Sequence, residues 1–311
     1  MLTLLGRAVD LAHRTGLVRP VRVAGVRVIS VGALTLGGAG KTPVAMAIAE
    51  AARDAGLPTA VVLRGYRGLC ERTGALVSDG ERLLTSVVEA GDEAVLHARR
   101  LPGVLVRIGA DRVEAVRRAR HDGARLVVLD DGFQHRRLAR DLDVVCLAPG
   151  LRRETDAALE RADLLVTVGE APGARTPGER PALSSRLEDW SPFPAPARTI
   201  DAPLVAAGIV RGPELVPFAD VGMLRGANVA LACAIARPER FVRLVERLGA
   251  RVVSLRARRD HSTLDPRDLQ TPRGADLLLV TEKDAVKLDR GVLALRVRVE
   301  VPSAAAPPRS P

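Results

Sequence analysis

The sequence predicts an α/β fold in which a mostly parallel sheet is flanked by helices, with a smaller C-terminal α/β lobe. Three observations predict it. Short apolar runs alternate with amphipathic segments from residue 28 to residue 168, a glycine-rich stretch follows the first run, and the same alternation resumes at residue 229. Alternation of this kind is typical of parallel sheets covered by helices. The 311 residues are enough for one large domain or two modest ones.

The composition is that of an ordinary globular protein, with 47% hydrophobic and 27% charged residues. Because aromatic residues make up only 2%, the core must be built from alanine, valine and leucine. No apolar run approaches the roughly 18 residues that a membrane-spanning helix needs, so we expect no such helix. We also expect no secretory signal, because the N-terminus is too charged. Three widely separated cysteines exclude a disulfide scaffold and argue against a zinc site: Cys70, Cys146 and Cys233.

The charge balance is basic, with 47 Lys and Arg against 37 Asp and Glu, a formal net charge of +10. Such a surface attracts nucleic acid, anionic lipid or phosphorylated substrates. The arginines are scattered along the whole chain, however, which indicates a drift in composition rather than one binding face. Lysine occurs only as Lys41, Lys283 and Lys287. Since arginine serves nearly everywhere else, these three are candidates for sites that need a compact point charge.

The first predicted element is an amphipathic helix in residues 1–26, whose apolar positions recur at helical spacing: Leu2, Leu5, Val9 and Ala12. This helix could rest on a membrane surface or pack against the rest of the protein. A strand over Val28–Val31, the glycine-rich stretch, a helix over Pro43–Ala55 and a strand over Thr59–Leu63 come next. This order of strand, loop, helix and strand is the unit that builds a parallel sheet.

The alternation then continues. The predicted strands are Val104–Ile108, Leu126–Leu129, Val144–Leu147 and Leu164–Val168, and the predicted helices are Ala94–Arg100 and Asp111–His121. Residues 171–198 are rich in Pro, Gly, Ser and Arg, which predicts a long surface connection. A second set follows, with strands Val229–Ile235, Val252–Leu255 and Leu277–Val280 and a helix Pro238–Leu248. We therefore divide the chain into an N-terminal helix (1–26), a main domain (27–200), a C-terminal α/β lobe (201–301) and a disordered tail (302–311).

The strongest local signal is a run between the first predicted strand and helix: Thr35, Leu36, Gly37, Gly38, Ala39, Gly40, Lys41 and Thr42. In a phosphate-binding loop, glycines let backbone N–H groups converge on oxygens, the lysine reaches the outer phosphates and the next hydroxyl binds Mg²⁺. Thr35 stands where the usual pattern has its first glycine. An ordinary glycine-rich turn is the competing interpretation. The flanking strand and helix and the rare lysine favour phosphate binding and a P-loop NTPase-like fold.

A second signal is the pair Asp130 and Asp131, which ends an apolar strand. In open α/β sheets, ligands bind at the carboxyl ends of the strands. Beside a phosphate-binding loop, carboxylates there typically help to hold Mg²⁺. We therefore expect Thr42, Asp130 and Asp131 at a magnesium site. The following run, Gly132–Arg137, brings amide, imidazole and guanidinium groups into one turn, although a solvated basic loop would look the same.

Further acids stand in Gly91-Asp92-Glu93 and Asp260-His261. A hydroxyl that accepts a phosphoryl group needs a base, and an aspartate is ionised near neutral pH. Spacing alone does not pair Asp92 with His261. A last signal, Thr281–Lys287, places two of the three lysines just after an apolar strand. Lys283 and Asp284 are adjacent there, which is the wrong spacing for a guanine-reading motif and argues against a guanine-specific enzyme.

Taken in order, these segments resemble the tetraacyldisaccharide 4'-kinase family, the lipid A 4'-kinases of Gram-negative bacteria. The most specific strings are Leu129-Asp-Asp-Gly-Phe-Gln-His-Arg-Arg137 and Thr281-Glu-Lys-Asp-Ala-Val-Lys287. The others are Gly37-Gly-Ala-Gly-Lys-Thr-Pro43, Arg64-Gly-Tyr66, Gly91-Asp-Glu93, Asp111-Arg-Val113, Ala236-Arg-Pro-Glu-Arg-Phe241 and Asp260-His261. They lie in the family's order over nearly the whole chain.

The resemblance implies a phosphotransferase with an alcohol acceptor. It would transfer the γ-phosphoryl group of ATP, with Mg²⁺, to the 4'-hydroxyl of a tetraacyldisaccharide 1-phosphate and so form lipid IVA in lipid A biosynthesis. It implies that Thr35–Thr42 binds ATP, that Asp92 is the catalytic base and that His261 is its partner. It further implies substrate or phosphate contacts from Arg112, Gln134, His135 and Glu154. The segment Pro149–Glu154 is shorter than the family's usual one, which affects the expected substrate contacts.

The expected partners are the lipid disaccharide and an anionic membrane surface, with no nucleic acid and no obligate protein partner. The expected location is the cytoplasmic face of the inner membrane, as a peripheral protein, or the cytoplasm. The main alternative is a P-loop NTPase switch, or a degenerate kinase, that acts on a protein partner. A nucleic-acid-binding module is a third interpretation, which scarce aromatic residues and the lack of a clustered basic face oppose.

Overall fold

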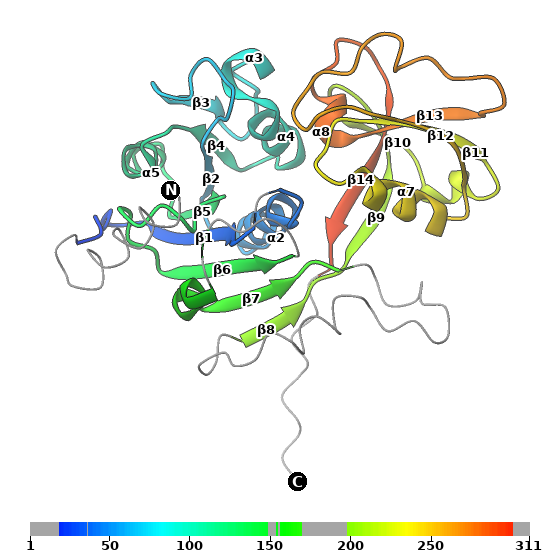
Figure 1. The fold of residues 1–311 in the computed structure, drawn as a ribbon. Coiled ribbons are helices and arrows are strands. Elements are labelled where there is room, and N and C mark those ends of the chain that lie inside the picture. Colours follow the sequence, from blue (N-terminus) through cyan, green and yellow to red (C-terminus); the bar gives the residue numbers. More distant parts are fainter. Residues whose placement is uncertain (1–18, 36, 149–153, 155, 170–197, 301–311) are drawn as a thin grey trace.

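The computed structural model describes residues 19–35, 37–148, 154, 156–169 and 198–300. Most of the predicted N-terminal helix, nearly all of the predicted connection at 171–198 and the predicted tail lie outside these residues and are drawn as a grey trace in Figure 1. No helix in the described part of the chain is long and apolar enough to cross a membrane.

The first sheet has eight strands in the order β3-β4-β2-β5-β1-β6-β7-β8. Their bounds are β1 Arg27–Ala33, β2 Thr59–Leu63, β3 Ala75–Ser78, β4 Leu105–Ile108, β5 Leu126–Asp130, β6 Leu142–Leu147, β7 Leu164–Thr167 and β8 Arg198–Asp201. Every neighbouring pair is parallel except β3 and β4, which are antiparallel. The central strands β2 and β5 are buried along their whole length, as strands covered on both faces must be.

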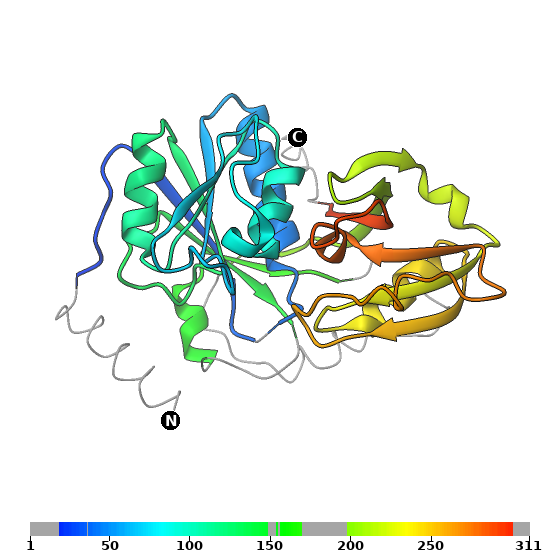
Figure 2. The same ribbon diagram turned by 90° about the horizontal axis from the view of Figure 1, so that it is seen from above.

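Helices cover both faces of this sheet. They are α2 Lys41–Asp54, α3 Val87–Ala90, α4 Asp92–Arg100, α5 Arg112–His121 and the 3₁₀ helix η1 Asp156–Arg161. Side chains of α2 and α4 pack in one apolar cluster with alternate residues of β1 and β2, whereas α5 packs with the intervening residues on the opposite face. Figure 2 shows α5 on one side of the sheet and α2 and α4 on the side that faces the C-terminal half. The prediction of a mostly parallel sheet flanked by helices is confirmed.

The second sheet has six strands in the order β10-β9-β14-β13-β11-β12. Their bounds are β9 Leu204–Arg211, β10 Val216–Ala219, β11 Asn228–Cys233, β12 Arg251–Ala257, β13 Leu277–Thr281 and β14 Leu293–Val299. Its helices are η3 Val221–Leu224, α7 Pro238–Arg247 and α8 Glu282–Ala285. Strands β11–β14 are parallel, and β9 joins them antiparallel to β14. β8 ends at Asp201 and β9 begins at Leu204, so the division that we propose between residues 200 and 201 falls at the end of β8.

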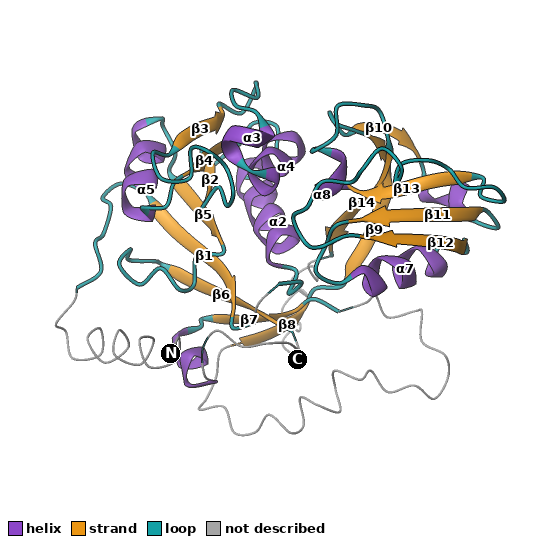
Figure 3. Ribbon diagram, turned by 45° about the horizontal axis from the view of Figure 1, so that its top comes forward, coloured by secondary structure: helices purple, strands orange, loops and turns teal. Residues whose placement is uncertain are grey.

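A buried ion-pair network joins the two halves where α4 lies beside α8 (Figure 3). Arg100 of α4 donates to Glu282 of α8 at 2.6 Å, and Arg296 of β14 donates to the same carboxylate at 3.0 Å. Arg100 and Glu282 have side chains only 8% and 5% exposed. Because this pair links the helix that carries Asp92 to the one that carries Lys283, it fixes the two halves of the site relative to each other.

Replacing Glu282 by alanine is expected to lower the free energy of unfolding by about 3 kcal/mol, because Arg100 would keep a buried charge without a carboxylate partner. Glu300→Ala is the matched control. Glu300 is 54% exposed and lies 3.7 Å from Arg298, so its loss should cost less than about 1 kcal/mol. Urea denaturation followed by circular dichroism measures both. Equal losses in the two variants would show that the buried pair contributes no more than a surface pair.

Candidate active site

The glycine-rich loop leads from β1 to the first turn of α2. Gly37, Gly38 and Gly40 have φ values of 64°, 62° and 80°, in the left-handed region that glycine adopts without strain. Gly40 is the N-cap of α2 and has no side chain with which to cap this 14-residue helix. A helix N-terminus that follows a glycine-rich loop in this way is typical of an anion site. Leu36 of the predicted run lies outside the described residues.

Lys41 reaches the acids that end β5. Its Nζ lies 2.7 Å from Oδ1 of Asp131, and its side chain is 13% exposed. The sheet explains this contact, because β1 and β5 are parallel neighbours with Val31 opposite Asp130. The loop that follows β1 and the residues that follow Asp130 therefore lie at the same edge of the sheet. The lysine of the loop and the carboxylate pair thus lie together, as the sequence predicted.

Asp130 is buried and only partly hydrogen-bonded. Its Oδ2 lies 2.8 Å from Nε2 of His97, whereas its Oδ1 has no hydrogen-bond partner among the described residues. A buried carboxylate oxygen without a donor fits a hard divalent cation, which prefers oxygen ligands. The residues present therefore fit a Mg²⁺ ion held by Asp130 and Asp131, with the Thr42 hydroxyl on the neighbouring helix.

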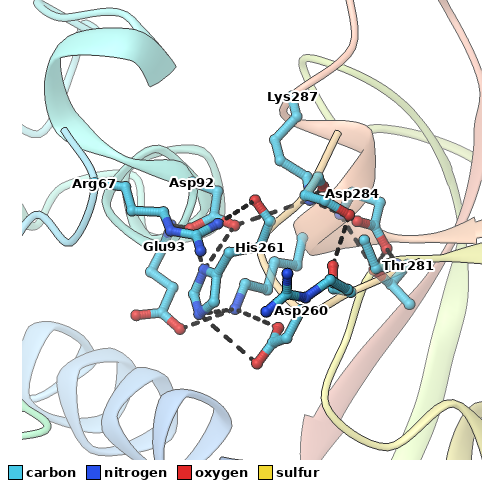
Figure 4. Close-up of polar contacts among 12 residues, drawn as sticks. Arg67, Asp92, Glu93, Asp260, His261, Thr281, Asp284 and Lys287 are labelled. Carbon is cyan, nitrogen blue, oxygen red and sulfur yellow. Dashed lines mark hydrogen bonds and ion pairs between the residues drawn. The ribbon is translucent and has the colours of Figure 1, made fainter. Parts of the chain in front are cut away.

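The Asp92–His261 pair lies between the two halves of the protein (Figure 4). Asp92 is the first residue of α4. Its Oδ2 lies 3.2 Å from Nδ1 of His261, although the two residues are 169 positions apart in the chain. His261 stands in the loop after β12. The ring of Tyr66 contacts the His261 ring edge-on at a centroid distance of 5.3 Å. The pairing that the family resemblance implied is therefore present in the structure.

The other two lysines surround this pair. Lys283 Nζ lies 3.1 Å from Oε1 of Glu93 and 3.2 Å from Nε2 of His261. Lys287 Nζ lies 2.7 Å from Oδ1 of Asp284 and 4.0 Å from Oδ2 of Asp92. Figure 4 shows Asp92 and Glu93 on α4 facing the residues of the C-terminal half. All three lysines of the chain thus lie beside the predicted site acids.

These contacts decide the charge of Asp92. Burial raises the pKa of its carboxyl group, but the hydrogen bond from His261 and the charges of Lys283 and Lys287 outweigh burial and hold that pKa below its ordinary value. Burial alone would lower the pKa of Lys283, but Glu93, Asp92 and Asp260 raise it above its usual value. Asp92 is therefore an ionised carboxylate at neutral pH, which is the state that can accept a proton.

Replacing His261 by alanine is expected to move the acidic limb of the kcat/KM profile to higher pH. The reason is that His261 lowers the pKa of Asp92, so its removal raises that pKa, and a carboxylate that serves as a general base must be ionised. Initial rates measured across the acidic range check this. His121→Ala is the control, because His121 is a 93% exposed residue at the end of α5. If the acidic limb does not move, ionisation of Asp92 does not control the measured activity.

Two further predicted residues, Arg112 and His135, feel the charge of Asp131, and Gln134 precedes His135 in the run after β5. Burial lowers the pKa of Arg112 to about 10, against the raising effects of Asp131 and Asp130. Burial also lowers the pKa of His135 to about 4, and the Arg112 cation adds to this effect, so His135 is neutral at pH 7. Gln134 donates through Nε2 to the carbonyl oxygen of Ala33 at 3.0 Å, which ties the run after β5 to the end of β1.

Glu154, the last predicted contact residue, is paired with two arginines. Arg136 and Arg161 each donate to its Oε2 at 2.7 Å, so the structure places it in an ion-pair cluster that joins the run after β5 to η1. The rest of the shortened segment, residues 149–153, lies outside the described residues.

Sequence reasoning missed two contributors to the site. Arg240 of α7 donates to the carbonyl oxygens of Gly38 and Val168, each at 2.8 Å, and so connects the C-terminal half to the glycine-rich loop. His97 on α4 bonds Asp130. The string Ala236–Phe241 contains Arg240 and could have indicated it. No motif marked His97, which stands in an ordinary helical segment.

A glycine-rich loop that leads into a helix and shares a sheet edge with two aspartates is typical of P-loop proteins that handle phosphoryl groups. An ionised acid, Asp92, lies between the two halves of the same protein. A sequence model described as tetraacyldisaccharide-1-P 4'-kinase matches residues 2–307. The chain belongs to this family.

Individual relatives agree with this assignment. The chain is 40% identical over 296 residues to a protein named tetraacyldisaccharide 4'-kinase from Anaeromyxobacter sp. (strain K), which covers 89% of this chain and 76% of the relative. It is 37% identical over 301 residues to the protein of that name from Syntrophus aciditrophicus, covering 88% and 78%. A crystal structure described as the "apo" form of LpxK from Aquifex aeolicus in complex with ATP superimposes with a TM-score of 0.75 at 26% identity, over 96% of this chain and 91% of that one.

Proposed function

We propose that the protein transfers the γ-phosphoryl group of ATP to the 4'-hydroxyl of a tetraacyldisaccharide 1-phosphate, forming lipid IVA in lipid A biosynthesis. The observation that carries the proposal is the position of α4. This helix begins with Asp92, the candidate base, and its His97 bonds Asp130 beside the Lys41–Asp131 ion pair. One element thus connects the acceptor side of the site to the nucleotide side.

The glycine-rich loop and the N-terminus of α2 would bind the ATP phosphates through backbone N–H groups, and Lys41 would neutralise charge on the outer phosphates. Thr42, Asp130 and Asp131 would hold Mg²⁺, which supplies charge stabilisation as the phosphoryl group moves. Arg112, Gln134 and His135 lie on the same side and would contact substrate or phosphate. In phosphoryl transfer the protein contributes mainly by positioning the reactants and neutralising charge, and it need not form covalent bonds to them.

On the acceptor side, Asp92 would accept the proton of the 4'-hydroxyl while the hydroxyl oxygen bonds to the γ-phosphorus and the bond to the ADP leaving oxygen breaks. His261 orients the Asp92 carboxylate through Nδ1. Lys283 and Lys287 keep that carboxylate ionised. Since the acceptor carries four acyl chains, we place the enzyme as a peripheral protein at the cytoplasmic face of the inner membrane, where the net charge of +10 favours anionic headgroups.

Incubation with γ-³²P-ATP, Mg²⁺ and the disaccharide 1-phosphate in detergent micelles tests the proposal. We expect a labelled bisphosphate lipid from the unmodified protein and none from Lys41→Ala. Hydrolysis of ATP without a labelled lipid would instead support the NTPase switch. ATP binding without any turnover would support the degenerate kinase.

A further inference from the structure

His97 is a polar side chain in an apolar layer. It lies on the face of α4 that packs against the first sheet, is 0% exposed, and has the buried residues Ala94, Val95 and Leu101 as chain neighbours in the core. Its polar contact is to Asp130, where Nε2 lies 2.8 Å from Oδ2. An apolar residue would fill this position equally well, so packing alone does not explain why a polar imidazole is buried here.

The hydrogen-bonding pattern defines the tautomer of this ring. Nδ1 of His97 is buried and has no hydrogen-bond partner within the described ranges. A proton on Nδ1 would be a buried donor without an acceptor, which is unfavourable, whereas a bare nitrogen lone pair costs less. The geometry therefore places the donor at Nε2, which donates to Oδ2 of Asp130.

The same bond fixes the direction of the Asp130 carboxylate. With Oδ2 held by His97, the oxygen left without a donor is the buried Oδ1. We propose that His97 is a positioning residue that orients Asp130 so that Oδ1 faces the Mg²⁺ of the ATP complex. This inference rests on the proposed function, in which Asp130 is a metal ligand. Carboxylates that bind metals are commonly oriented by such hydrogen bonds, whose loss typically costs 10- to 100-fold in metal affinity.

The position of His97 in α4 gives this bond a second consequence. His97 follows Asp92 by five residues, so the two side chains leave the helix roughly 140° apart. Asp92 faces His261 and the lysines of the C-terminal half, and His97 faces the strand edge of the first half. The His97–Asp130 bond therefore fixes the position of Asp130, the proposed metal ligand, relative to Asp92, the candidate base.

The test compares two substitutions. His97→Leu fills the apolar space but removes the donor, whereas His97→Gln retains an N–H group that can reach Asp130. Mn²⁺, a spectroscopic substitute for Mg²⁺, is titrated by electron paramagnetic resonance in the presence of a non-hydrolysable ATP analogue. Binding of the same analogue in EDTA gives the metal-free affinity, and thermal unfolding confirms that each variant is folded.

We expect His97→Leu to weaken Mn²⁺ binding about 10- to 100-fold with the metal-free nucleotide affinity changed less than about twofold, and His97→Gln to recover most of the loss. His121→Leu, an exposed histidine, should match the unmodified protein. Unchanged Mn²⁺ affinity in His97→Leu overturns the proposal, and so does an equal loss of metal-free affinity or a lack of recovery in His97→Gln.

A measurement on the unmodified protein does not depend on the folding of any variant. In ¹⁵N spectra of histidine-labelled protein, we expect His97 as the Nε2–H tautomer, with its signals shifted when Mg²⁺ and the analogue are added together. An Nδ1–H tautomer, or no shift, contradicts the positioning role. If these results hold but no labelled lipid forms, the proposed function fails while the role of His97 in nucleotide–metal binding stands.

Discussion

Replacing Lys41 by alanine is expected to lower kcat/KM about 1,000-fold, because a cation that neutralises transferring phosphates typically contributes on this scale. Lys41 is the first residue of α2, is 13% exposed and lies 2.7 Å from Asp131. Initial rates of lipid phosphorylation at varied ATP concentrations measure the loss. The fold should persist, since Asp131 is 37% exposed and water can solvate it once Lys41 is gone.

Arg53→Ala is the matched control for this experiment. Arg53 lies in the last turn of the same helix and pairs with Asp54 at 2.8 Å, so its removal deletes a cation from α2 far from the loop. Its kcat/KM should stay within about twofold of the unmodified protein. A loss smaller than tenfold in Lys41→Ala would mean that the glycine-rich loop does not hold the reacting phosphates.

The first half of the fold could be predicted from the sequence because its signals are local. The strand Thr59–Leu63 consists of Thr59 and four apolar residues, and the structure has it with the same bounds. The second half was less predictable. Arg296 and Arg298 interrupt the apolar pattern of β14, yet Arg296 is accommodated because Glu282 accepts from it in the protein interior. Glu282 lies beside Arg296 only in the folded protein, so the spacing of apolar residues in the sequence does not predict the contact.

In the candidate site, too, some contacts could be predicted from the sequence and others could not. Lys41 and the aspartates of β5 could be brought together from sequence because parallel neighbours end at one edge. Asp92 and His261 meet only because two lobes pack, so their pairing came from the family resemblance. His97 could not be predicted, since a histidine beside Arg99 and Arg100 in the last turn of a helix is typical of a solvated end. Its burial is set by how α4 lies on the sheet.

Replacing Asp92 by asparagine is expected to lower kcat by about 10²- to 10⁴-fold, the usual contribution of a general base, while nucleotide affinity changes less than about twofold. Asparagine keeps the size of the side chain but cannot take the proton of the acceptor hydroxyl. Rates at saturating lipid and ATP give kcat, and binding of a fluorescent ATP analogue gives the affinity. Asp54→Asn, at a 66% exposed position of α2, is the control.

A double substitution then separates the role of Asp92 from that of His261. Because His261 acts through the Asp92 carboxylate, adding His261→Ala to Asp92→Asn should lower kcat by much less than His261→Ala does alone, as residues in direct contact are not additive. Additive losses would instead mean that His261 touches the acceptor or the phosphate itself. An equal fall in ATP affinity in Lys41→Ala and Asp92→Asn would contradict the division of the site into a nucleotide side and an acceptor side.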